Sequence, residues 1–203
     1  MHPRLPNLVI GYHGCDRDTF ESVLYRHEPM KKSENDYDWL GHGIYFWENN
    51  YERAYDWAKE MAVRKRRDVN NVAVIGAVLD LGACLNLTDG YSIRHVKNAF
   101  DGYKMYSLDS GKPVAKNMSI GNSSDLLLRN LDCAVIQWLH KFLNDAGEEP
   151  FDSVRGIFLE GKELYPNSGF NDKTHVQLCV VNDDCIKGLF APEQYVMAMG
   201  LGD

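Results

Sequence analysis

The sequence predicts an α+β domain whose core is a mixed or split β-sheet flanked by helices. Short β-branched and aromatic runs stand near both ends of the chain, and the segments with helical spacing lie between them. Long gaps separate several of these runs, which argues against a regular alternation of strands and helices around a parallel sheet. At 203 residues, a single domain over 1–203 is expected.

The predicted strands are apolar runs bounded by glycine or polar residues. The first of them ends at His13-Gly14, and another is the aromatic run that begins at Gly43. They cover 8–12, 43–47, 71–80, 154–159, 176–181 and 186–190. The polar segments 28–38 and 165–173 are expected to be loops.

The predicted helices carry apolar residues at three- and four-residue intervals. One contains Phe20, Val23 and Leu24 behind a cap at Asp16 or Asp18. A second begins at a cap on Asn49 or Asn50 and runs to about Arg67, and a third covers 126–143. The region from about 90 to 123 is richer in glycine and lysine. It is predicted to be an irregular insertion holding one helix near 93–100, and the tail from Met199 is predicted to be frayed.

Composition narrows the possible partners and the compartment. The net charge of −7 does not attract the chain as a whole to nucleic-acid phosphates, although a local basic patch can still act. The basic run from Arg64 to Arg67 is either the solvated end of a helix or a substrate-binding patch.

The cysteines and the apolar segments point to the cytoplasm. Five scattered cysteines without a CxxC pair predict reduced thiols and neither a disulfide framework nor a zinc site. Residues 1–7 contain no apolar run of the signal-peptide kind, and no window approaches the roughly 18 apolar residues of a membrane span. A cytoplasmic protein with no membrane partner and no metal is therefore expected.

Three short segments stand out as candidates for chemistry. They are Gly11-Tyr12-His13-Gly14, Gly41-His42-Gly43-Ile44-Tyr45-Phe46 and Lys173-Thr174-His175-Val176-Gln177-Leu178. Each one alone is compatible with an ordinary strand end or a tight glycine entry. Their order, spacing and position in the chain together favour a function.

These segments resemble the ADP-ribosyltransferase superfamily, on the side of the poly(ADP-ribose) polymerases and diphtheria toxin. That side is known for a His-Tyr-Glu triad borne on three separate strands. His13 in its Tyr-His-Gly setting matches the histidine, and Tyr45 in its Gly-x-Gly-x-Tyr-Phe setting matches the tyrosine. The resemblance covers the first strand through the helix from Asn50, and then the last three strands. It implies an ADP-ribosyltransferase-like split sheet that is mixed or antiparallel. Within the superfamily, the late segments are similar to an uncharacterised bacterial or phage-associated branch.

The resemblance implies that NAD is the co-substrate and assigns a role to each match. His13 would donate a hydrogen bond to ribose hydroxyls, and Gly14 would offer its backbone to the nicotinamide amide because no side chain blocks the approach. Tyr45 would stack on the nicotinamide ring, and Gly43, two residues before it, is also expected to bind the cofactor. Tyr55 or Trp57 on the following helix would close the sandwich.

The third position departs from the family pattern. Gln177 stands where the family has its catalytic glutamate, and a glutamine offers a hydrogen bond but neither a full charge nor a base. Three interpretations stay open. The acceptor itself assists a single transfer, a carboxylate from elsewhere such as Glu160 or Glu163 replaces the glutamate, or the activity is weakened to NAD sensing. Elongation to poly(ADP-ribose) is not expected, because it depends on that glutamate.

The remaining candidates are weighed individually. His175 either acts as a base or faces solvent. Residues 170–173 lie where the family recognises its acceptor, and residues 35–40, which include Trp39, are candidates for bordering the adenosine. His42 is expected to be structural, and His140 is expected on a helix surface.

The functional expectation is an NAD-dependent mono-ADP-ribosyltransferase that cleaves the nicotinamide–ribose bond and transfers ADP-ribose to a macromolecular acceptor, protein or nucleic acid. A bacterial or phage-related toxin or defence effector with an antitoxin or immunity protein fits this expectation. The alternatives are an NAD glycohydrolase and a non-catalytic module that binds NAD or ADP-ribose.

Overall fold

The computed structural model describes residues 8–120 and 125–194, so the predicted frayed tail from Met199 lies outside the described residues. A seven-stranded sheet in the order β4-β5-β6-β2-β1-β3-β7 forms the centre. Only β4 and β5 are parallel neighbours, and the other adjacent pairs are antiparallel. The strands are β1 Val9–Asp16, β2 Ile44–Glu48, β3 Val72–Leu79, β4 Cys84–Asn86, β5 Ser153–Phe158, β6 His175–Val180 and β7 Ile186–Phe190. The prediction of an α+β chain with a mixed sheet is confirmed.

The sheet is joined weakly at its centre. β1 pairs with β3 along eight residues, from Val9–Leu79 to Asp16–Val72. It pairs with β2 only at Gly11–Glu48 and Tyr12–Trp47. The sheet therefore consists of two well-paired halves, β4-β5-β6-β2 and β1-β3-β7, which part after Tyr12.

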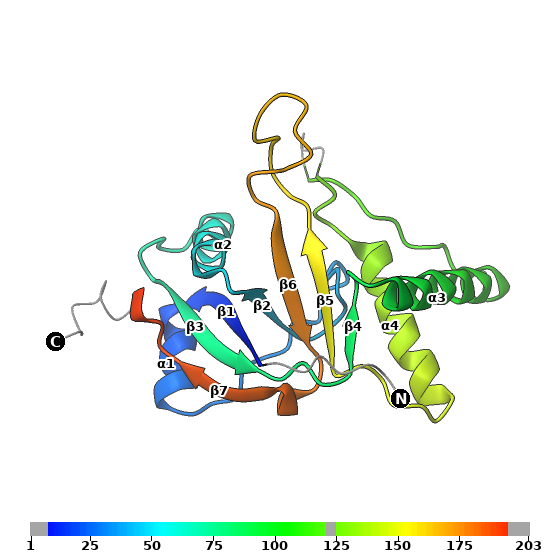
Figure 1. Ribbon diagram of the computed structural model, residues 1–203, viewed down its shortest axis with the longest axis horizontal. Helices are drawn as coiled ribbons and strands as arrows, with labels where there is room; N and C mark the ends of the chain where they lie inside the picture. Colours follow the sequence, from blue (N-terminus) through cyan, green and yellow to red (C-terminus); the bar gives the residue numbers. More distant parts are fainter. Residues whose placement is uncertain (1–7, 121–124, 195–203) are drawn as a thin grey trace.

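Two helices accompany the β1-β3-β7 half, as Figure 1 shows at the left. α1 (Arg17–Tyr25) begins at Asp16, whose side chain accepts from the Thr19 backbone N–H, and α2 (Tyr51–Arg64) begins at Asn50, which caps Arg53 in the same way. The expected end of α2 near Arg67 is wrong by one turn. Lys65 caps the helix, and Arg66 adopts a left-handed φ of 54°, which ends it.

The helix expected near 93–100 is present, but it is much longer than predicted, so most of the supposed irregular insertion is helical. α3 spans Gly90–Asp109, and the side chain of Asp89 caps it by accepting from the Ser92 backbone N–H. Gly102 made this segment look irregular, because glycine in a helix is usually unfavourable. Here a β-carbon at Gly102 would lie 3.0 Å from Nε1 of Trp138 on the neighbouring helix, so the glycine permits close helix packing. Residues 110–120 follow without a helix or strand, apart from an isolated bridge between Met118 and Leu128.

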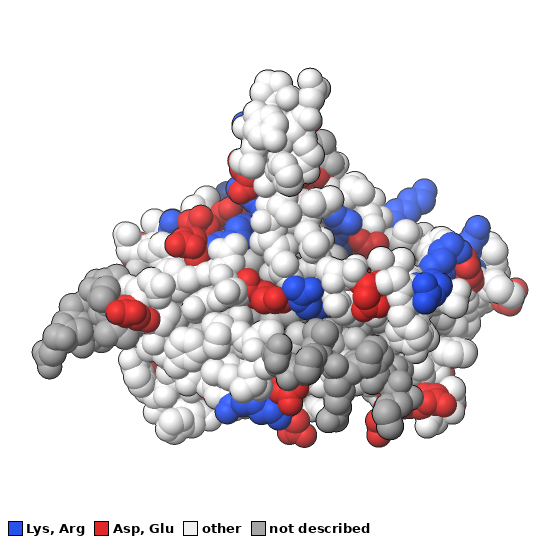
Figure 2. All heavy atoms as spheres, in the orientation of Figure 1, with Lys and Arg blue, Asp and Glu red and all other residues white. Residues whose placement is uncertain are grey.

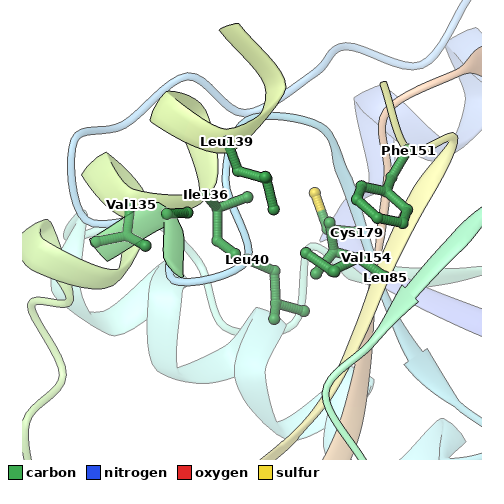
Figure 3. Packing of buried hydrophobic residues seen from close by; sticks show 9 residues of the cluster. Leu40, Leu85, Val135, Ile136, Leu139, Phe151, Val154 and Cys179 are labelled. Atoms are coloured by element: carbon green, nitrogen blue, oxygen red, sulfur yellow. The ribbon is translucent and has the colours of Figure 1, made fainter. Parts of the chain in front are cut away.

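α4 (Asn130–Asp145) packs on α3 and covers the other half of the sheet. Figure 3 shows its buried face against β4, β5, β6 and Leu40. The short β4 and the 3₁₀ turn Asp183–Cys185 had no counterpart in the sequence prediction. The surface position expected for His140 is also wrong, because its side chain is buried against Phe151 at a ring separation of 6.2 Å. The described core on this side consists of Leu40, Leu85, Ala99, Val135, Ile136, Leu139, Phe151, Val154 and Cys179.

The connection between β5 and β6 projects from the body of the molecule, at the top of Figure 1. Its exposed side chains include Leu164, Tyr165 and Phe170, and Figure 2 shows a tip with few charges. Two ion pairs tie the base of this projection to α2. They join Lys173 to Glu60 and Arg53 to Glu160. Within the described parts of the chain, no helix is long and apolar enough to cross a membrane.

Candidate functional site

His13 lies where the two halves of the sheet part. Its Nδ1 is 2.8 Å from the backbone oxygen of Tyr45, a residue of β2 that has no partner in the β1–β2 ladder. A carbonyl oxygen can only accept, so Nδ1 carries the proton and donates. The sequence motifs around His13 and Tyr45 are therefore joined by one hydrogen bond.

The charge state of His13 follows from its burial. Loss of solvent lowers the pKa of the His13 imidazole, and the hydrogen bond to Tyr45 opposes this to a smaller extent. At neutral pH the ring is then uncharged, and Nε2 carries a lone pair. This geometry favours Nε2 as a hydrogen-bond acceptor, whereas the family resemblance implies a donor.

Gly14 has a packing reason of its own. A β-carbon at this position would overlap the backbone oxygen of Ala54 and would approach the side chain of Ala58 to 3.2 Å. α2 therefore crosses β1 directly at Gly14. Gly43 is equally confined, because a β-carbon there would lie 2.5 Å from the backbone oxygen of Val180 on β6. Both glycines allow close backbone approach within the fold itself.

The side chain of Tyr45 locks a turn. Its hydroxyl donates to the backbone oxygen of Gly41 at 2.8 Å and accepts from the backbone N–H of Leu40 at 3.0 Å. The ring packs against the core cluster that contains Leu40, and burial raises the pKa of Tyr45 well above its usual range. The hydroxyl is a neutral structural group, and the backbone oxygen is what meets His13.

Gln177 lies on β6 beside β2, on the same face of the sheet as Tyr45. Its register partner on β2 is Trp47, so Tyr45 is its diagonal neighbour. Its Oε1 accepts from Nε1 of Trp39 at 2.6 Å. Trp39, which was only a candidate for bordering the adenosine, is thus in direct contact with Gln177, the third residue of the predicted set.

His175 is buried, at 5% exposure, so the solvent-facing interpretation is wrong. Nδ1 donates to the backbone oxygen of Lys173 at 2.6 Å, and the rings of Phe158 and Trp47 lie 5.6 and 6.1 Å away. Burial is the main cause that lowers the pKa of His175. Nε2 has no hydrogen-bond partner among the described residues, and the same is true of Nε1 of Trp47.

The two carboxylates proposed to replace the glutamate occupy different surroundings. Glu160 is buried and pairs with Nη2 of Arg53 at 2.8 Å. Its charge and that of Arg53 both influence the pKa of His175, which places the three groups close together. Glu163 lies in the exposed hairpin connection and accepts from the backbone N–H of Asn167. Arg53 was missed in the sequence, although a charged residue on the sheet-facing side of a predicted helix is a usable signal.

A groove of about 710 Å³ runs between β1, the start of α1 and α2. His13, Gly14 and Trp57 line it, together with Lys65 and Arg67 of the basic run. The other lining residues are Cys15, Asp16, Asp18, Thr19, Ala58, Met61, Ala62, Asp68, Asn71 and Val72. The basic run is therefore not only the solvated end of a helix, because two of its members face the same groove as His13.

The predicted site residues thus fall into two neighbouring zones. The groove holds His13, Gly14 and Trp57, and the face of β2 and β6 holds Tyr45, Gln177 and His175. Tyr55 belongs to neither zone, because its ring stacks on Tyr51 at 6.2 Å and lies under the Lys59 ammonium. The acceptor-loop candidate Asp172 accepts from the backbone N–H of Lys162 within the hairpin. No group of three or more His, Cys, Asp or Glu side chains suited to a metal ion is present in the described ranges.

An uncharacterised protein of Methanocaldococcus jannaschii is 29% identical to this chain over 199 residues, which cover 88% of this chain and 84% of that protein. No family model matches the sequence, and no solved structure matches it. The relative shares most of its length with this chain, so the similarity is not confined to one motif.

Proposed function

We propose that the chain binds NAD in the groove between β1 and α2 and along the adjoining face of β2 and β6, where Gln177 lies, and transfers a single ADP-ribose unit to a macromolecular acceptor. The observation that carries this proposal is the hydrogen bond from His13 to the backbone of Tyr45. It joins two motifs 32 residues apart at the point where the sheet parts, and Gln177 lies on the adjacent strand. The three sequence motifs lie on the adjacent strands β1, β2 and β6.

The groove suits a ligand of this size and chemistry. Its volume of about 710 Å³ is within the usual range for sites that enclose small ligands. Trp57 offers an aromatic surface beside His13 and Gly14, and Lys65 and Arg67 supply positive charge for a diphosphate. Arg67 is already paired with Asp16 at 3.0 Å, so the anion would compete with one carboxylate for it.

The chemistry would follow the pattern of glycoside cleavage. The bond between nicotinamide and ribose breaks, its electron pair stays on the departing nicotinamide, and positive charge spreads over the ribose ring. A lone pair of the acceptor then forms the new bond, and the acceptor gives up its proton. The neutral imidazole of His13 has a free Nε2 lone pair that can take this proton, whereas the amide of Gln177 cannot.

The direct test is incubation of the purified protein with NAD labelled on its adenylate half and with whole-cell lysate. We expect nicotinamide to be released and the label to appear on a macromolecule. Protease and nuclease digestion then identify the class of acceptor. His13→Ala should abolish the labelling, and the matched control His95→Ala, on the remote helix α3, should leave it unchanged.

The outcomes separate the competing functions. Release of free ADP-ribose without a labelled macromolecule would identify an NAD glycohydrolase. Tight NAD binding without turnover would identify a sensing or binding module. The absence of both binding and turnover would overturn the proposal. Glu160→Gln tests the replacement carboxylate, since a catalytic carboxylate predicts a fall in nicotinamide release of at least about a hundredfold at unchanged affinity for NAD.

A further inference from the structure

We propose that Trp39 is a positioning residue that fixes the side-chain amide of Gln177 with its NH₂ group free for the ligand. Gln177 then acts as a hydrogen-bond donor at the position where the family carries an acceptor carboxylate. This inference rests on the proposed function. It specifies that Gln177 donates hydrogen bonds to the ligand, which the sequence alone left open.

The first step concerns the contact itself. The indole N–H of Trp39 can only donate, so the Gln177 atom 2.6 Å away must be the amide oxygen. The identity of the bonded atom therefore follows from chemistry and fixes the orientation of the amide. One lone pair of the oxygen is taken by Trp39, and the two N–H donors of Gln177 point elsewhere.

The second step concerns the rigidity of Trp39. It belongs to the turn that the Tyr45 hydroxyl locks through Leu40 and Gly41. The same turn is held by a backbone hydrogen bond from Gly41 to Asp38 at 2.7 Å. An indole on such a turn is restrained before any ligand arrives.

The third step concerns the room that the sheet leaves for the indole. Gly156 on β5 is the register partner of Gln177, and a β-carbon there would lie 2.6 Å from Cη2 of Trp39. The missing side chain lets the indole lie against the strand beside Gln177. The ring of Phe158 flanks it at 5.0 Å. Tyr45, Trp39 and Gln177 thus form one connected path from the second motif to the third.

The consequence concerns the ligand group that Gln177 can recognise. Two amide donors match an oxygen with free lone pairs, such as a ribose hydroxyl that is itself free to donate elsewhere. They offer nothing to a group that needs a base. Orientation by Trp39 also spares the ligand the entropy of ordering a free glutamine side chain.

The first experiment is a double-mutant cycle on NAD binding, measured by titration calorimetry. Trp39→Phe keeps the aromatic packing but removes the donor, and we expect the Kd for NAD to rise about fivefold. In the background of Gln177→Leu, the same change should alter the Kd by less than about twofold, because its target is gone. Trp138→Phe, on α4, is the matched control and should leave the Kd unchanged.

A second measurement does not need NAD. The ¹H–¹⁵N signal of the Trp39 indole, assigned by its loss in Trp39→Phe, should lie downfield and exchange slowly with solvent. In folded Gln177→Leu it should move upfield and exchange faster.

Equal effects of Trp39→Phe in both backgrounds, or an indole signal unmoved by Gln177→Leu, would overturn the inference. Failure of the wild-type protein to bind NAD would instead overturn the proposed function. In that case the indole signal alone would decide whether the contact exists.

Discussion

Individual residues that the sequence analysis assigned to a ligand also have a structural role in the fold. Gly14 was expected to face a ligand, yet its first neighbour is the backbone of α2. Tyr45 was expected to present a ring, yet its hydroxyl holds a turn and its backbone oxygen receives His13. At each of these positions the packing or hydrogen bonding of the fold gives a structural reason for the residue.

Gly14→Ala should therefore destabilise the fold whether or not a ligand is present. The new methyl group would overlap the Ala54 carbonyl, and relief requires that α2 move away from β1. We expect the free energy of unfolding in urea to fall by about 1–3 kcal/mol. Gly188→Ala, where nothing lies within 4 Å of the added β-carbon, is the control. Equal stability of the two variants would contradict this packing.

Two histidines with a lowered pKa, His13 and His175, predict a pH dependence of stability. The folded-state pKa values of His13 and His175 are lowered by burial, while the unfolded chain titrates near 6.5. Below about pH 6.5 the unfolded state binds protons that the folded state does not, so stability falls as the pH falls and is flat above that window. Urea unfolding of His175→Leu should show a shallower decline between pH 7 and 5 than the wild type. His27→Asn, at an exposed position, should match the wild-type slope.

Among the elements, the hairpin of β5 and β6 depends on α2 for its anchorage. The Arg53–Glu160 pair is buried on both sides, and the exposed Lys173–Glu60 pair adds a weaker contact. The position of the projecting loop is therefore linked to the helix that lines the groove.

Arg53→Met should cost about 3–5 kcal/mol of unfolding free energy, because it leaves the Glu160 carboxylate buried without its partner. The double variant Arg53→Met with Glu160→Met should recover most of that loss, since it removes both charges. Chemical denaturation of the single and double variants measures this. If Arg53→Met alone were neutral, the pair would not be buried as described.

The element-scale predictions from the sequence succeed where apolar periodicity is strong. The runs that became β1, β2, β3, β5, β6 and β7 could all be assigned, because local propensity and burial agree there. The cap of α1 and the cap of α2 are each one of the two residues predicted for it. β4 has only three residues and exists through its parallel pairing with β5. Of α3 only the part near 93–100 was predicted, because the packing reason for Gly102 appears only beside Trp138.

The positions of the candidate site residues were predictable to a similar degree, while their roles stay predictions. The motif histidine, tyrosine and glutamine could be named from local sequence, and the structure places them on three neighbouring strands. The contact between Trp39 and Gln177 joins residues 138 positions apart and has no local signature. The burial of His140 and His175 likewise depends on elements that pack over them.

At the scale of the whole molecule, expression in a living cell tests the expectation of a toxin or defence effector. If the chain is a toxin or defence effector, induced expression in a bacterial host without a neutralising partner should arrest growth and deplete NAD. His13→Ala should restore growth at equal protein level, and His27→Asn should not. Arrest by folded His13→Ala would show that toxicity does not come from the proposed site.

Because the sheet parts after Tyr12, its two halves are joined through few contacts between β1 and β2. On one side, eight residue pairs fasten β1 to β3, and on the other only two fasten it to β2. Beyond those two pairs, the side chain of His13 links β1 to β2 through its hydrogen bond to the Tyr45 backbone oxygen. A molecule bound to this imidazole would therefore touch a side chain that joins the two halves of the sheet.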